Sequence, residues 1–163
     1  MRSSLLLGLH FIEAMSYLGL PSACRNDFIY MVPPFLAYNG ALYGNYTMLW
    51  EAYNQCRLYR DYLRDGSAGG LWKHVLLGSW DDRGHWSTGH GWAAAGMLRV
   101  YGTIKNSGYS SSMRAELNDL ESWVSEIHEA IYPYMVSYLL FFVCHLPGEL
   151  MCLYQTARRR YVP

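Results

Sequence analysis

Residues 47–65, TMLWEAYNQCRLYRDYLRD, constrain the fold most, because their apolar side chains recur every three to four positions. This spacing places the apolar side chains on one face of an α-helix and the polar ones on the other. The apolar positions are Leu49, Ala52, Tyr53, Cys56, Tyr59, Tyr62 and Leu63, and the polar positions are Glu51, Asn54, Arg57, Arg60 and Arg64. Gly66, Gly69 and Gly70 follow, so the sequence predicts an amphipathic helix that ends before them.

Two further segments predict helices that contribute to the same core. Residues 28–44 are apolar on most faces, as in a buried helix, so Pro33 and Pro34 must lie near its start or kink it. Residues 113–132 predict a helix with an apolar inner face made by Leu117, Leu120, Trp123, Val124 and Ile127.

A glycine-rich connection leads to one more helix. Residues 71–77, LWKHVLL, alternate like a strand, and residues 78–91, GSWDDRGHWSTGHG, read as a loop. Residues 92–107 then predict a helix whose start Ser87 or Thr88 would cap. The helices pair into two helix–loop–helix hairpins, so we expect an all-α fold of repeated αα units.

The two ends of the chain differ from the middle. Residues 1–25 begin like a signal peptide, with one arginine before a leucine run, so we expect a secreted protein. Residues 136–163 are an apolar stretch followed by three arginines. Pro133 interrupts the uncharged run before His145, which is shorter than the about 20 residues of a membrane helix, so we expect no membrane span.

The charge balance and the aromatic content limit the class of partner. Lysine and arginine together number 13 and equal the 13 aspartates and glutamates, so the net charge gives no electrostatic reason to expect a nucleic-acid partner. The 15 tyrosines and 6 tryptophans are unusually many. Such rings fill protein cores, and they also line sites that stack on sugars.

Cysteine spacing and one sequon leave alternatives open. Cys24, Cys56, Cys144 and Cys152 lack the spacing of a zinc site, so they are buried thiols or, as the alternative, disulfide partners. Asn45 begins an N-glycosylation sequon, or else it caps the helix that follows it.

Four side chains that can ligate a metal lie close together in the glycine-rich loop: Asp81, Asp82, His85 and His90. Their spacing matches no known metal motif such as HExxH. Ser87 does not lie in a GxSxG elbow, and no lysine follows the glycines as it would in a P-loop. We therefore expect no metal, no other cofactor and no serine nucleophile.

The same loop has the composition of a sugar site. Trp86 and Trp92 offer flat apolar faces, while His74, His90 and Thr88 offer hydrogen bonds. In the alternative interpretation, two tryptophans at the start of a helix simply pack in the core.

Asp27 is a charged residue directly before an apolar helix, and two roles are open for it. It can cap the first turn, the common reason for aspartate at this position. It can also be a general acid that apolar neighbours keep protonated near neutral pH.

Three ordered segments carry a resemblance to known enzymes: NDFIYMVPPFLAYNG, GLWKHVLLGS and GHWSTGHGWAAAGMLRV. Over about residues 26–135 the chain resembles the unsaturated uronyl hydrolases of glycoside hydrolase families 88 and 105. The resemblance implies part of an (α/α)6 toroid of helical hairpins, with about five helices in this chain. It also implies an enzyme that removes 4,5-unsaturated uronic acid from oligosaccharides that lyases release, of pectin (rhamnogalacturonan) type.

The resemblance implies a role for individual residues and no cofactor. Asp27 corresponds to an aspartate that protonates C4 of the vinyl ether, after which water adds at C5 and the hemiketal falls apart. His74 corresponds to a histidine that contacts the substrate. Trp86 and Trp92 frame a WxxGxGW element that shapes the subsite for the unsaturated sugar.

The sequence also departs from that family. His90 stands where many relatives have asparagine, and Thr88 stands where bacterial relatives often have an arginine that pairs with the uronate, so His85 or Arg83 would have to replace it. A second family aspartate has no counterpart in residues 1–25. We therefore expect impaired activity or, as the alternative, a non-catalytic helical remnant that the C-terminal apolar segment attaches to a membrane. In either case, helix faces that a complete toroid would cover are expected to be exposed.

Overall fold

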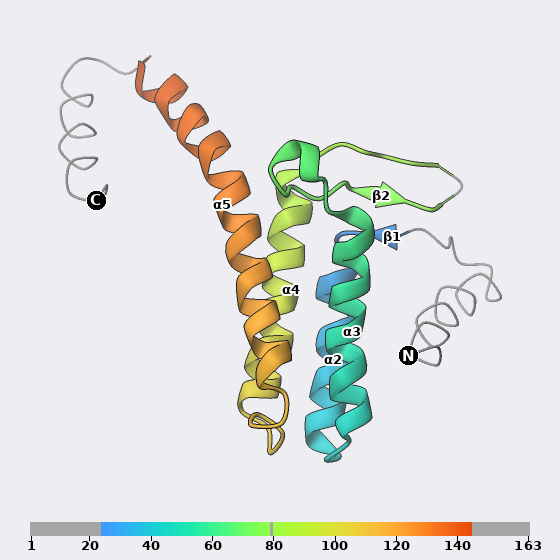
Figure 1. The fold of residues 1–163 in the computed structure, drawn as a ribbon. Coiled ribbons are helices and arrows are strands. Elements are labelled where there is room, and N and C mark those ends of the chain that lie inside the picture. Colours follow the sequence, from blue (N-terminus) through green and yellow to red (C-terminus); the bar gives the residue numbers. More distant parts are fainter. Residues whose placement is uncertain (1–23, 79, 145–163) are drawn as a thin grey trace. The chain divides into compact units, whose positions relative to one another are not determined.

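The computed structural model describes residues 24–78 and 80–144, with side chains as far as residue 135. In chain order its elements are β1 (Cys24–Arg25), α2 (Phe28–Leu42), α3 (Tyr46–Leu63), the short 3-10 helix η1 (Gly66–Ala68), β2 (Val75–Leu76), α4 (Ser87–Lys105) and α5 (Arg114–Cys144) (Figure 1). The expected all-α class is confirmed. The signal-like residues 1–23 and the tail residues 145–163 lie outside the described residues.

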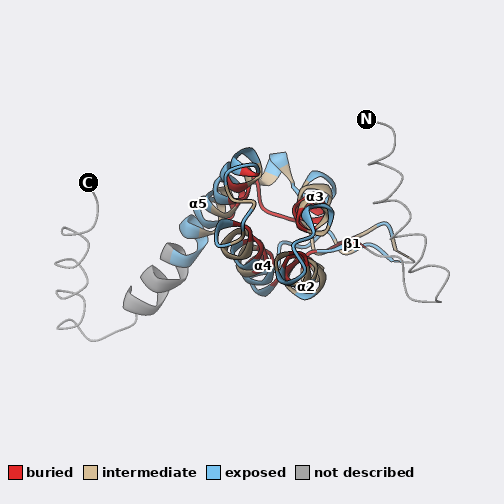
Figure 2. Cartoon of the chain, turned by 90° about the horizontal axis from the view of Figure 1, so that it is seen from below, coloured by how far each residue is buried: buried red, intermediate tan, exposed pale blue. Residues whose placement is uncertain are grey.

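The chain divides into two units, Met1–Ala130 and Ile131–Pro163. Within the first unit, α2 packs against both α3 and α4, and the end-on view shows α2 and α4 side by side (Figure 2). Helices α2 and α4 begin at the end of this unit where β1 and β2 lie, and α3 runs in the opposite direction (Figure 1). The two loops that lead into α2 and α4 therefore meet at one end of the helices.

Helix α2 spans the predicted residues, but Pro33 and Pro34 lie in its interior rather than near its start. Pro33 has no N–H to donate to the Ile29 carbonyl oxygen one turn earlier. This oxygen lies against Gly96 of α4, where any Cβ atom would overlap it. The two helices approach closely at this point because α4 has no side chain there.

One face of α2 is exposed although it is apolar. The helix contains no charged residue, and Met31, Phe35, Tyr38 and Leu42 are each 57–65% exposed. The expectation of burial on most faces is therefore wrong for this side of α2, while the expectation of an exposed apolar helix face holds for it. We call these four residues the α2 stripe.

Helix α3 confirms the amphipathic prediction with two exceptions. Asn45 caps it, since its side chain accepts a hydrogen bond from the Met48 N–H at 3.2 Å. Tyr62, predicted on the inner face, is exposed, and Asn54, predicted on the polar face, is buried. The buried face of α3 therefore differs from the predicted one, because α3 has polar contacts with α5 as well as apolar contacts with α2. Arg60, for example, donates to Glu126 at 2.6 Å.

Helix α5 has the predicted inner face, with Leu117, Leu120, Trp123 and Ile127 buried and Val124 half-buried. The prediction that it ends near residue 132 is wrong, because the helix continues through Pro133 to Cys144. A proline removes one helical hydrogen bond, and the segment from Ile131 to Cys144 contains no glycine, asparagine or aspartate that would end a helix.

Helix α4 begins earlier than predicted. It starts at Ser87, and its N-cap is Trp86, so neither Ser87 nor Thr88 caps it through its side chain. Gly89 is accommodated in the first turn because α4 packs there against the buried side chain of Asn26, which a Cβ atom at this position would overlap.

The described residues also bear on the expectations about the cysteines and about a membrane span. Cys24 and Cys56 are buried free thiols, and burial raises the pKa of Cys24 to about 12. Within the part of the chain that the structure describes, none of the helices combines the length and apolarity needed to span a bilayer.

Candidate functional site

Asp27 and His74 are brought together by the pairing of the segments that contain them. Strands β1 and β2 are antiparallel, with Arg25 opposite Val75. One residue further on, the Asn26 N–H donates to the His74 carbonyl oxygen at 3.1 Å. Two motifs almost 50 positions apart in the sequence are therefore adjacent at the start of α2.

Asp27 forms an ion pair in place of the cap that one alternative assigned to it. It occupies the N-cap position of α2, but its side chain accepts no capping hydrogen bond. Its two carboxylate oxygens instead accept from Nε and Nη2 of Arg25, each at 3.2 Å. The Asp27 side chain is 31% exposed, so the expectation of a carboxyl group enclosed by apolar rings is not met in the described residues.

Asp82 organises the opposite side of the site, and sequence analysis did not assign it this role. Its Oδ2 atom accepts from the indole N–H of Trp86 and pairs with Nδ1 of His74, both at 2.9 Å. Its Oδ1 atom accepts from the Gly84 N–H at 2.9 Å. The His74 hydrogen bond is the main reason that the pKa of Asp82 lies below its ordinary value. Since a carboxylate only accepts, Nδ1 of His74 carries a proton, and in the neutral ring Nε2 is an acceptor.

The two indoles face outward to a large extent. Trp86 is 55% and Trp92 is 43% exposed, so the alternative that both pack in the core is wrong. The Trp86 ring contacts the His74 ring, with centroids 5.6 Å apart. The Trp92 ring contacts Tyr30, one turn after Asp27 in α2, with centroids 4.7 Å apart. We call Asp27, His74, Trp86 and Trp92 the aromatic site.

His90, which was also predicted to bind substrate, is buried and fully engaged. Its Nδ1 donates to the Trp86 carbonyl oxygen at 2.6 Å, and its Nε2 accepts from the Trp72 N–H at 2.7 Å. Neither ring nitrogen is available to a ligand, so the structure gives His90 the role of fixing Trp86 at the start of α4. Thr88 lies exposed in the first turn of that helix.

The two residues expected to replace the missing arginine are both paired with carboxylates. Arg83 contacts Asp81 at 3.3 Å on the exposed loop. His85 contacts Asp65 at 3.3 Å, and Lys73 lies 3.8 Å from the same carboxylate. Another cation, Arg25, lies directly beside Asp27.

Sequence analysis did not recognise the roles of two residues of this region, Asp82 and Asn26. The D-x-G-x-W order of Asp82, Gly84 and Trp86 is a signal for a turn closed by an aspartate side chain, and it was available in the sequence. Asn26 is fully buried against Gly89, and among the described residues its side-chain amide has no hydrogen-bond partner. Its neighbour in α4 is set by tertiary packing, which local sequence patterns do not contain.

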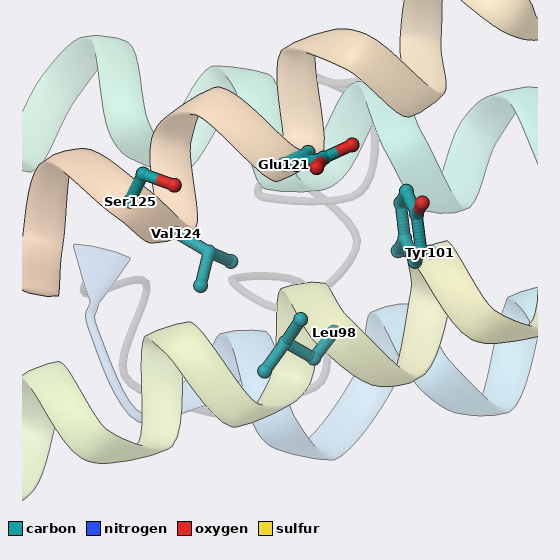
Figure 3. Close-up of a pocket in the computed structure, with 5 residues that line it drawn as sticks. All are labelled: Leu98, Tyr101, Glu121, Val124 and Ser125. Carbon is teal, nitrogen blue, oxygen red and sulfur yellow. The ribbon is translucent and has the colours of Figure 1, made fainter.

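No group of three or more metal-ligating side chains gathers anywhere in the described ranges. One pocket of about 230 Å³ lies between α4 and α5, lined by Leu98, Tyr101, Glu121, Val124 and Ser125 (Figure 3). It includes none of the residues that the sequence predicts for the site.

Comparison with models of protein families, with curated proteins and with solved structures finds no match to this chain.

Proposed function

We propose that this chain is part of an unsaturated uronyl hydrolase of the (α/α)6 type, acting on oligosaccharides whose non-reducing end is a 4,5-unsaturated uronic acid. The observation that carries the proposal is that residues of three separate motifs lie at one end of α2 and α4. The Asn26–His74 hydrogen bond, the Tyr30–Trp92 contact and the His74–Trp86 contact connect them. The two helical hairpins are compatible with two repeats of such a toroid.

In the proposed reaction, Asp27 transfers a proton to C4 of the double bond, and a water molecule adds at C5 and returns a proton to the carboxylate. The resulting hemiketal opens and releases the leaving sugar. The exposed faces of Trp86 and Trp92 would hold the flat unsaturated ring. His74, with Nε2 as its acceptor, would receive a hydrogen bond from a sugar hydroxyl.

The proposed activity is lower than that of family members that have both aspartates. The second aspartate of the family has no counterpart in this sequence, and Asp27 is ion-paired and partly exposed. The proposed general acid needs a carboxyl group enclosed by apolar neighbours, and the Asp27 side chain lacks that enclosure.

The test follows the ultraviolet absorbance of an unsaturated disaccharide, which disappears when the conjugated double bond is hydrated. The purified chain should remove this absorbance slowly, and Asp27→Asn should abolish the decay. Asp61→Asn is the matched control, because Asp61 pairs with Arg57 on the exposed face of α3 and should retain the wild-type rate. A folded chain that leaves the absorbance unchanged would instead be the non-catalytic helical remnant.

A further inference from the structure

We propose that Arg25 binds the carboxylate of the uronic acid and that this binding competes with its ion pair to Asp27. The inference rests on the proposed function, since it names the residue that selects an acidic sugar at that same site. Arg25 lies outside the three motifs from which the site was predicted. It is the last residue of β1 and directly precedes the first motif.

The geometry of the Arg25–Asp27 pair leaves room for a second carboxylate. Asp27 uses Nε and Nη2 of the guanidinium, which is one of the two edges on which arginine binds a carboxylate in a bidentate manner. The remaining edge, between Nη1 and Nη2, has the same donor spacing. The Arg25 side chain is 45% exposed, so it is in contact with solvent.

The chemistry of the substrate requires the cation to be close to the acid. In a 4,5-unsaturated uronic acid, the carboxylate is attached to C5, which is bonded directly to the carbon that Asp27 would protonate. A cation that binds this carboxylate must therefore lie next to the proton donor. Arg25, which contacts Asp27 directly, meets this requirement.

Other described cations near this end are already placed differently. Arg83 pairs with Asp81 and Lys73 lies beside Asp65, so the printed ion pairs place neither cation next to Asp27 as they place Arg25. The guanidinium of Arg99 lies over the Tyr30 ring, 5.0 Å from its centroid, and it is the main competitor for a bound uronate.

A substrate carboxylate would compete with Asp27 for the guanidinium of Arg25. A partly exposed ion pair is weak, so a substrate carboxylate can compete for the guanidinium. A bound uronate that shares or takes Arg25 would therefore weaken or replace the contact between Arg25 and Asp27.

The test uses calorimetry to compare the binding of two methyl glycosides. One is that of a saturated uronic acid, which has no double bond to hydrate, and the other is that of the corresponding neutral sugar. The wild-type chain should prefer the acid, and Arg25→Gln should weaken acid binding by about tenfold or more without affecting the neutral glycoside. Arg25→Lys, which keeps the charge but loses the bidentate geometry, should fall between the two. Arg83→Gln is the matched control and should bind like wild type.

Asp27→Asn provides a result of opposite sign, because removal of the competing carboxylate should strengthen binding of the acid several-fold. Loss of acid binding in Arg99→Gln rather than in Arg25→Gln would overturn the proposal, and so would an Asp27→Asn chain that binds the acid no better than wild type. Because this ligand is not turned over, failure here is distinct from failure of the proposed function, which the absorbance assay reports.

Discussion

At the scale of single residues, His90 shows how a polar side chain in the candidate site serves the fold. Burial is the main cause of its lowered pKa, so the folded chain holds the neutral ring. Both nitrogens bond to the backbone, at Trp86 and Trp72. The unfolded chain accepts a proton near the ordinary value of 6.5, whereas the folded chain does so only at lower pH.

This difference predicts that the free energy of unfolding decreases as the pH falls below 6.5, because the unfolded state then binds more protons. The slope contributed by His90 cannot exceed about 1.4 kcal/mol per pH unit, the limit for one proton. His90→Asn should remove this contribution in urea unfolding curves between pH 7 and pH 5, within the range where histidine titrates. His128→Gln, an exposed histidine on α5, should leave it in place. An unchanged slope in His90→Asn would contradict the assignment.

Asp82 is predicted to hold the ring of His74 and the indole of Trp86 in position through its charge. Because its folded pKa is depressed, its contribution is present above the ordinary value of 3.8 and is lost as the pH falls through the folded value. We expect the Trp86 indole N–H signal in NMR spectra to exchange faster with water in Asp82→Asn and in acid. Asp81→Asn, which affects the exposed pair with Arg83, should not change it. A signal indifferent to Asp82→Asn would rule out this role.

At the scale of elements, the contact between α2 and α4 depends on a missing side chain. A Cβ atom at Gly96 would overlap the Ile29 carbonyl oxygen, whereas a Cβ atom at Gly102 meets nothing within 4 Å. Both glycines lie in α4, so they form a matched pair.

Gly96→Ala should lower the free energy of unfolding by about 1–3 kcal/mol, the usual cost of overpacking. Gly102→Ala should raise it by about 0.5–1 kcal/mol, since alanine is the better helix former. Chemical denaturation followed by circular dichroism measures both. Equal effects of the two substitutions would mean that α2 and α4 are not in close contact at Gly96.

Periodicity predicted the helices well and their ends poorly. The spacing of apolar residues in α3 and α5 depends on local geometry alone, so the sequence contains it. The early start of α4 depends on the contacts of Asn26 with Gly89 and of His90 with Trp72, which are far apart in sequence. The length of α5 depends on Pro133, which the helix tolerates in its interior. The same holds for the candidate site: the sequence named Asp27 and His74 separately, and the pairing of β1 with β2, which brings their segments together, depends on contacts far apart in the sequence.

At the scale of the whole molecule, the α2 stripe predicts self-association. Met31, Phe35, Tyr38 and Leu42 form a row of exposed apolar side chains on a helix without charges. Contiguous apolar surface of this kind promotes association or aggregation. The double substitution Phe35→Glu and Tyr38→Glu should lower the light scattering of concentrated solutions and the fluorescence of a hydrophobic dye. Tyr62→Glu, at an exposed tyrosine of α3 outside the stripe, should do neither; equal effects would remove the stripe as the cause.

The central claim is that three sequence motifs form one sugar-binding site, and NMR titration of the tryptophan indole signals tests it most directly. An unsaturated uronic disaccharide would be titrated into the Asp27→Asn chain, which in the proposed mechanism has no acid to hydrate it. We predict that the Trp86 and Trp92 signals shift together with one dissociation constant, while the buried Trp123 stays fixed. Signals of Trp86 and Trp92 that stay fixed, or that shift with different constants, would contradict the claim.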